Sequence, residues 1–159
     1  MKPKDMKTRF NIEKVDPNAY SSMLTLERYV GKTPLKIAYK ELIKIRASQI
    51  NGCAYCIEMH TADARKHGET ESRIYALSAW RESPLFSAEE RALLALTEEV
   101  TLLANRGLSD ETYSELQKYF NETTIAQAIM QVVAINAWNR ITVSTKMMHS
   151  HQLQAEAVG

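Results

Sequence analysis

The strongest constraint on the fold is where glycine and proline occur in the sequence. The 159 residues contain only five Gly and four Pro, and these fall where amphipathic stretches end. Between them apolar residues recur every three to four positions, a pattern typical of helices with one buried face. No convincing alternating strand is found. The sequence therefore predicts an all-α protein, a compact bundle of about six or seven helices.

Capping signals predict where the helices begin and end. Asp16-Pro17 is typical of an N-cap followed by proline at the first helical position, and this helix is expected to stop near Gly31. Thr33-Pro34 repeats the signal for a helix that ends near Asn51-Gly52. Further helix starts are expected at Cys53, Thr70, Ser87, Ser109 or Asp110, and Thr123 or Thr124.

The helix after Ser87 is the clearest amphipathic stretch. Ser87 and Glu90 form a capping box, and the helix is expected to close near Gly107. Its predicted core stripe is Leu93, Leu96, Val100 and Leu103. The last long stretch, Ile125–Val143, is rich in β-branched residues and could be a strand, but its length and spacing favour a helix.

Length and charge bound the organisation and the partners. We expect one helical domain over residues 18–148, with an N-terminal extension at 1–17 and a C-terminal tail at 149–159. Twenty basic and nineteen acidic residues leave a net charge of +1, so the chain has no overall positive field that would attract nucleic acid or anionic lipid. No apolar run is long enough for a membrane-spanning helix, and the N-terminus does not resemble a secretory signal. A cytoplasmic protein is the expectation.

The only two cysteines, Cys53 and Cys56, form a single C-x-x-C. A secreted scaffold spreads its cysteines to join distant segments. A pair three residues apart closes a tiny loop and stabilises a fold little. In a reducing compartment such a pair is more typical of redox or metal chemistry.

His60 shares a helix face with the two cysteines. Spacings of three, four and seven place all three side chains within an arc of about 60°. Both cysteines fall in or near the first turn, where unpaired backbone N–H groups favour a thiolate. An imidazole one turn later can accept a thiol proton directly or through water. This pattern suits a thiolate that reacts and is then resolved by its neighbour.

Glu41 is the fourth candidate, because it lies on an apolar stripe of the preceding helix. A buried carboxylate is costly without a partner, and desolvation is expected to raise its pKa towards that of a useful proton acceptor. The break at Asn51-Gly52 lets this helix fold back on the next. We therefore expect Glu41 to approach His60 and the two thiols.

These residues resemble a known active-site signature. A Glu twelve residues before C-x-x-C-x-x-x-H is similar to the signature of the alkylhydroperoxidase D family, part of the carboxymuconolactone decarboxylase superfamily. The similarity continues through Tyr75–Pro84, the stretch SAEERALLALTEEVT and Ile135–Arg140, and so covers nearly the whole chain after about residue 18.

The resemblance implies an all-helical homo-oligomer, often a trimer or hexamer, that reduces hydroperoxides without a cofactor or metal. Cys56 would be the peroxidatic cysteine that forms a sulfenic acid, and Cys53 would resolve it to a disulfide. Glu41 and His60 would form a proton relay, with water, that deprotonates Cys56. An external dithiol, such as a lipoylated or thioredoxin-like protein, would reopen the disulfide. Tyr55 stands where well-studied members carry a second His, and Tyr is a poor base at neutral pH.

Other interpretations of the cysteines remain open. They could be buried and inert, or they could bind zinc with His60 and Glu41 in a structural or redox-sensing module. The resemblance to the superfamily also suggests that the chain could be a lactone decarboxylase, although the decarboxylases proper generally lack the cysteine pair.

Several further residues carry weaker hypotheses. Tyr55 could orient the site or line its entrance, and Trp80 and Trp138 are expected in the core or at a subunit interface. His67 precedes a C-capping Gly and is explained by the helix dipole. For the polar residues of the last helix a pocket role is possible and a buried hydrogen-bond role is favoured; these are Asn136, Asn139 and Arg140.

Overall fold

The computed structural model describes residues 7–148, and it is helical throughout, with no strand in that range. The predicted all-α fold is therefore confirmed. The predicted C-terminal tail at 149–159 lies outside the described residues, as do residues 1–6. The helices are α1 Ile12–Val15, α2 Pro17–Lys32, α3 Ile37–Asn51, α4 Ala54–Lys66, α5 Glu71–Ala76, α6 Ala88–Thr101, α7 Asp110–Gln117 and α8 Glu122–Thr145, with short 3₁₀ turns at Leu77–Ala79 and Leu103–Asn105.

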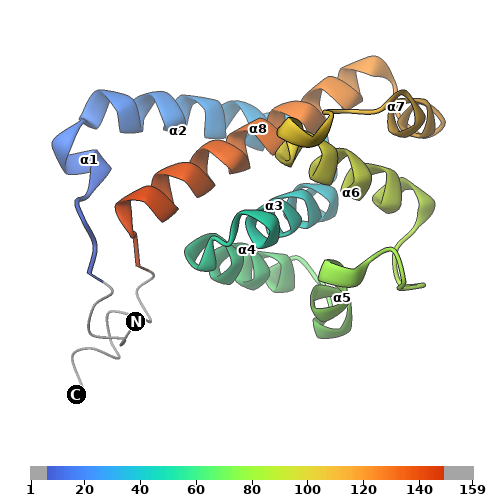
Figure 1. Cartoon of the computed structure of the whole chain (residues 1–159), viewed down its shortest axis with the longest axis horizontal. Helices are drawn as coiled ribbons and strands as arrows, with labels where there is room; N and C mark the ends of the chain where they lie inside the picture. Colours follow the sequence, from blue (N-terminus) through green and yellow to red (C-terminus); the bar gives the residue numbers. More distant parts are fainter. Residues whose placement is uncertain (1–6, 149–159) are drawn as a thin grey trace.

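Helix α3 is the centre of the molecule and packs against α4, α6 and α8 (Figure 1). Its Ile43, Ile45 and Ala47 are fully buried. Ile43 packs with residues of α6, α7 and α8, while Ile45 packs with residues of α4, α6 and the 3₁₀ turn after α5. A third, smaller cluster joins Ala47 to the two cysteines and to Ile135 of α8. The site predicted from the sequence therefore lies at the contact between the central helix α3, which carries Glu41, and α4.

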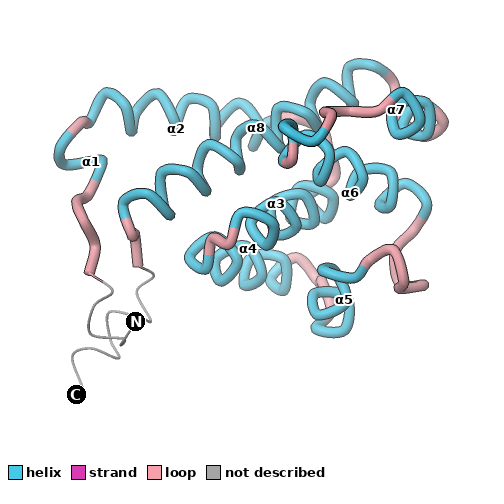
Figure 2. The backbone as a smooth tube through the Cα atoms, viewed as in Figure 1, coloured by secondary structure: helices cyan, strands magenta, loops and turns pink. Residues whose placement is uncertain are grey.

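Helix α2 lies outside this core, alongside the C-terminal half of α8 (Figures 1 and 2). Only Val30 of its side chains is buried. The short α1 turns the chain back, and the backbone N–H of Arg9 donates to the carbonyl of Thr145 at 2.8 Å. Helices α2 and α8 thus form one wall beside α3 and α4. No helix in residues 7–148 is both long and apolar enough to cross a membrane.

Most predicted helix starts are confirmed by observed caps. The Asp16 side chain accepts the N–H of Ala19, with Pro17 in the first turn. Ser87 and Glu90 form both bonds of the capping box. Thr70 and Ser109 cap α5 and α7 in the same way, since each side chain accepts an N–H three residues on.

Three predictions about helix limits are wrong. Thr33-Pro34 does not open α3, because the Thr33 hydroxyl donates back to the Val30 carbonyl and closes α2, so α3 begins at Ile37. The last helix is capped by Asn121 rather than Thr123 or Thr124.

The third error concerns the end of α6. That helix ends at Thr101 instead of continuing towards Gly107. Leu103, predicted in the core stripe, lies in a separate 3₁₀ turn and is 67% exposed. The change from α-helical to 3₁₀ geometry turns its side chain out of the helical register.

Candidate active site

The turn between α3 and α4 places the cysteines at a helix start. Gly52 caps α3 with a φ of 66°, a left-handed conformation that favours glycine. Cys53 is the N-cap of α4, and its Sγ accepts the N–H of Cys56 at 3.3 Å. The two cysteines form a disulfide with a Cα–Cα distance of 5.3 Å, and both are 1% exposed. The predicted position at the first turn of the helix is confirmed.

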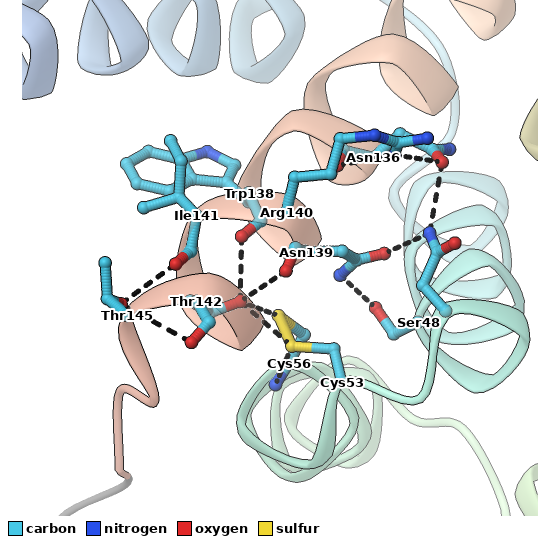
Figure 3. The surroundings of a disulfide bond; sticks show 11 residues. Ser48, Cys53, Cys56, Asn136, Trp138, Asn139, Arg140, Ile141, Thr142 and Thr145 are labelled. Carbon is cyan, nitrogen blue, oxygen red and sulfur yellow. Dashed lines mark hydrogen bonds between the residues drawn. A yellow bond between two sulfur atoms is a disulfide. The ribbon is translucent and has the colours of Figure 1, made fainter. Parts of the chain in front are cut away.

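Polar side chains of α8 fix the end of α3 beside this turn (Figure 3). Asn51 donates to the side-chain oxygens of Asn139 at 2.9 Å and Asn136 at 3.0 Å. The Asn139 amide in turn donates to Ser48 at 3.0 Å. The favoured buried hydrogen-bond role is thus confirmed for Asn139, while Asn136 makes its hydrogen bonds in a half-buried position. For Arg140 the buried role is wrong, because its side chain is exposed and donates to Asn136 from the surface.

One turn further along α8, Thr142 reaches the sulfur atoms. Its Oγ1 lies 3.0 Å from Cys53 Sγ and 3.3 Å from Cys56 Sγ (Figure 3). Thr142 is 4% exposed. The disulfide is therefore held between the first turn of α4 and a hydroxyl of α8.

Glu41 of α3 approaches His60 of α4, as the sequence led us to expect. Glu41 Oε2 and His60 Nδ1 are 3.3 Å apart, although these two atoms are not aligned as a hydrogen bond. The other carboxylate oxygen accepts from Lys44 Nζ at 2.9 Å. Glu41 and His60 are only 5% and 7% exposed, so a buried carboxylate lies between an imidazole and an ammonium.

The expected direction of the Glu41 pKa is wrong. Burial on its own raises the pKa of this carboxyl, but the contact with His60 and the charge of Lys44 outweigh it. The pKa of Glu41 therefore lies below its ordinary value, because a nearby cation favours the charged form. Glu41 is a carboxylate at neutral pH, and it supports His60 as an anion rather than taking up a proton itself.

A cavity of about 350 Å³ lies between α2, α3, α4 and α8 and borders the disulfide. Of the two cysteines only Cys56 lines it, together with His60 and Thr142. The opposite walls are largely apolar and aromatic. The remaining lining residues are Tyr20, Leu24, Glu27, Lys44, Tyr55, Met59, Asp63, Trp138 and Met147.

The structure also places the weaker candidates. Tyr55 lines the cavity, as does Trp138, whose Nε1 donates to Glu27 at 3.0 Å. Trp80 is 5% exposed and lies in the core, which is one of the two positions predicted for it, the other being a subunit interface. His67 Nδ1 lies 2.8 Å from the Asp63 carbonyl in the last turn of α4, which fits its capping role.

A zinc site finds no support in the arrangement of the side chains. Within residues 7–148 no group of three or more His, Cys, Asp or Glu side chains is positioned to hold a metal ion.

Two residues of the site escaped the sequence analysis. Lys44 lies one turn after Glu41, so the i, i+3 spacing was a signal that could have found it. Thr142 lies 86 residues beyond Cys56 among β-branched residues. Nothing in the sequence distinguishes it from Thr145, one turn further along.

Comparison with known sequences gives a family. The sequence model of the carboxymuconolactone decarboxylase family matches residues 17–99. The uncharacterized protein YdfG of Bacillus subtilis (strain 168) is 41% identical over 139 residues, covering 87% of this chain and 95% of YdfG. The alkyl hydroperoxide reductase AhpD of Hyphomonas neptunium is 42% identical over 55 residues, covering 35% of this chain and 29% of AhpD.

Solved structures share the fold. ATU0492 from Agrobacterium tumefaciens, a protein of unknown function with a suggested AhpD role in antioxidant defence, matches with a TM-score of 0.88 and 40% identity, over 90% of this chain and 98% of that one. The debrominase Bmp8 in its apo form has a TM-score of 0.77 and 18% identity, over 89% of this chain and 76% of Bmp8. The Bmp8 likeness shows the fold alone.

Proposed function

Because the chain belongs to the carboxymuconolactone decarboxylase family, and within it resembles the alkylhydroperoxidase D proteins, we propose that it is a cysteine-dependent peroxidase. Its substrate is a hydroperoxide, and its electrons come from an external dithiol through Cys53 and Cys56. The observation that carries the proposal is that Cys56 of the cysteine pair and His60 of the buried Glu41–His60 pair line the same cavity.

The first step is attack by Cys56. In the reduced protein His60 takes the Cys56 proton, which leaves a thiolate beside an imidazolium. The thiolate attacks the distal oxygen of the hydroperoxide, the O–O bond breaks, and Cys56 becomes a sulfenic acid. The alkoxide that leaves takes the proton from His60 and departs as an alcohol. Only Cys56 of the pair lines the cavity, which supports its role as the attacking sulfur.

The second step returns the pair to a disulfide. The Cys53 thiol attacks the sulfenic sulfur, the S–O bond breaks, and the thiol proton leaves with the hydroxyl as water. The 5.3 Å between the two Cα atoms suits this bond. A dithiol, such as that of a lipoylated or thioredoxin-like protein, then reduces the disulfide and is itself oxidised.

Glu41 supports the charge that forms on His60. A buried carboxylate 3.3 Å from Nδ1 stabilises the imidazolium and orients the ring, so that the other ring nitrogen is left for proton transfer. This differs from a relay in which Glu41 itself accepts the proton, because its pKa lies below its ordinary value.

The test compares three proteins supplied with a dithiol and an organic hydroperoxide. We expect Cys56→Ser to abolish turnover. In a parallel reaction without the dithiol, Cys53→Ser should reduce one equivalent of peroxide and then stop at a sulfenic acid. Peroxide should remove both thiols of the wild-type protein without joining subunits. If Cys56→Ser retains wild-type turnover, the assignment is wrong.

The alternatives make different predictions. A lactone decarboxylase would consume its lactone with both cysteines replaced, and a zinc module would carry one metal per chain by elemental analysis. The fold shared with a debrominase does not extend the proposal to halogenated substrates.

The family resemblance also leads us to propose a cytoplasmic homo-oligomer, a trimer or hexamer. Light scattering at micromolar concentration tests the oligomer, and a monomer peak would count against it.

A further inference from the structure

Thr142 is a buried side chain that the proposed reaction does not yet use. It comes from α8, far along the chain, and its Oγ1 is within hydrogen-bond reach of both sulfurs, at 3.0 Å from Cys53 and 3.3 Å from Cys56. It also lines the cavity that Cys56 borders. A single oxygen therefore bridges the two reacting atoms (Figure 3).

The hydrogen-bonding capacity of Thr142 is only partly used by its own helix. A hydroxyl has one hydrogen and two acceptor lone pairs. Thr142 Oγ1 lies 2.7 Å from the Trp138 carbonyl, the usual bond of a helical threonine, and this leaves its lone pairs facing the sulfurs. Thr145 makes the same bond to Ile141 at 2.8 Å without any sulfur contact. The sulfur contacts are thus specific to one of two neighbouring threonines.

The backbone at the start of α4 favours the other sulfur atom. At the start of α4 the Cys56 N–H points to the sulfur of Cys53, at 3.3 Å, and so favours negative charge on Cys53. The proposed reaction requires the negative charge on Cys56 instead. A hydroxyl that contacts both sulfurs can set which of them carries the proton.

We propose that Thr142 is a catalytic residue that polarises the reduced pair: its O–H, which donates to the Trp138 carbonyl beside the disulfide, turns to the Cys56 thiolate, while its oxygen accepts the S–H of Cys53. When Cys56 becomes a sulfenic acid, the same hydroxyl passes the Cys53 proton to the departing hydroxyl, which leaves as water. Protons balance, since Thr142 gives one and receives one. This inference rests on the proposed thiol–disulfide cycle of the pair.

The test measures the pKa of Cys56 from the pH dependence of its alkylation by iodoacetamide. It uses a Cys53→Ser background, where the introduced serine hydroxyl can still donate to Thr142. A hydrogen bond to a charged group contributes about 1.5–3 kcal/mol. We therefore expect Thr142→Val to raise the Cys56 pKa by about 1 or more, with an at least tenfold lower thiolate fraction below that pKa.

Two matched controls separate the hydroxyl from packing. Thr142→Ser and Thr142→Ala are both small and differ only in the hydroxyl, so Ser should keep the wild-type pKa and Ala should match Val. Thr145→Val loses an equivalent helical bond on the same helix and should leave the Cys56 pKa unchanged. The Ser and Ala pair carries the test if Thr142→Val does not fold. The other charged or titratable groups that line the cavity stay unchanged in every variant; these are Tyr20, Glu27, Lys44, Tyr55, His60 and Asp63.

The inference is overturned if Thr142→Ala has the same Cys56 pKa as Thr142→Ser. It is also overturned if Thr145→Val raises that pKa as much as Thr142→Val does. Alkylation requires no peroxide, so the two proposals can fail separately. Suppose that the Cys56 pKa depends on the Thr142 hydroxyl but the protein shows no peroxide turnover. That result would reject the proposed peroxidase activity and would support the effect of Thr142 on the thiols.

Discussion

Glu41 shows how two neighbours decide the protonation state of a buried carboxyl. Burial alone would raise its pKa, and the sequence led us to expect that direction because only its apolar neighbours were considered. Lys44, one turn along α3, lies 2.9 Å from Oε1, and His60 lies 3.3 Å from Oε2. The two contacts reverse the direction of the pKa shift.

Replacing Lys44 should make the site sensitive to acid. Lys44→Met removes a cation that lowers the Glu41 pKa, so that pKa should rise towards neutrality through the effect of burial. In the wild-type protein Glu41 stays ionised until the pH falls below its ordinary pKa. In the variant we expect the acid limb of Cys56 alkylation to move to higher pH, by about 1.

The control for Lys44→Met is Lys118→Met. Lys118 forms an ion pair of the same i, i+3 spacing with Glu115 on exposed α7. The Lys118→Met variant should have the same pH profile of Cys56 alkylation as the wild-type protein. An acid limb that does not move in Lys44→Met would show that Lys44 does not set the charge of Glu41.

Individual residues of the site were predictable where spacing along one helix carries the information. Cys56 and His60 line the same cavity because of the helical period, which the sequence reveals directly. Cys53 lies outside that period, because it is the N-cap with an extended backbone. The approach of Glu41 also followed, because the tight turn at Gly52 folds two adjacent helices together. Thr142 did not, because its contact depends on where α8 crosses α4.

At the scale of the helices, Glu98 of α6 joins three segments. Its Oε1 accepts from Arg46 of α3 at 2.9 Å and from Trp80 Nε1 at 2.8 Å, and Oε2 pairs with Arg81. Burial raises the pKa of Glu98, but these three donors outweigh it and hold the pKa below its ordinary value. Glu98 is thus a carboxylate that attaches α6 to its neighbours.

Glu98→Gln should destabilise the fold by about 2 kcal/mol at pH 7, since it weakens charge-assisted hydrogen bonds in a partly buried position. A depressed carboxyl pKa stabilises the fold above the unfolded-state pKa, and this stability is lost as the pH falls through the folded-state pKa. The difference between wild type and variant in urea unfolding should therefore shrink below about pH 4. Exposed Glu82→Gln should match the wild type, and a difference that grew at low pH would contradict the assignment.

Helix limits were predictable where a side chain caps its own helix. Asp16, Thr70, Ser87 and Ser109 all bond to N–H groups three residues on, and such local bonds depend on sequence alone. Thr33 misled the prediction because its hydroxyl closes the preceding helix instead of opening the next. A threonine between two helices can serve either, and the packing of α2 and α3 decides which.

At the scale of the whole molecule, the core does not depend on the disulfide. Two of the three buried clusters, centred on α3 with α6 and α8 and on α3 with α4, contain no cysteine. A bond between residues three apart removes little freedom from the unfolded chain. We therefore expect reduction by a dithiol to lower the free energy of unfolding by at most about 2 kcal/mol.

The measurement is calorimetry of the oxidised and reduced protein, with the Cys53→Ser, Cys56→Ser double variant as the reference for a chain that cannot form the bond. The reduced wild type and the double variant should melt within a few degrees of each other. Unfolding on reduction would show that the pair is structural.

The overall arrangement of the chain was beyond sequence reasoning for one physical reason. The class and the central signature follow from local patterns, although residues 7–148 form eight helices rather than six or seven, with the short α1 not expected. The cavity, in contrast, needs α2 and α8 to lie beside α3 and α4. Those contacts join residues more than 80 positions apart, such as Trp138 with Glu27. Apolar stripes indicate that helices pack, without indicating which pairs do so.

The spacing of the two cysteines has a consequence for signalling. Both belong to a single turn, so we expect that making and breaking their bond rearranges a few atoms at one end of α4 and leaves distant surfaces unchanged. A partner protein that binds far from the cysteines would then meet the same surface in the oxidised and reduced protein. Such a chain is better suited to repeated electron transfer than to acting as a redox sensor that signals to another protein.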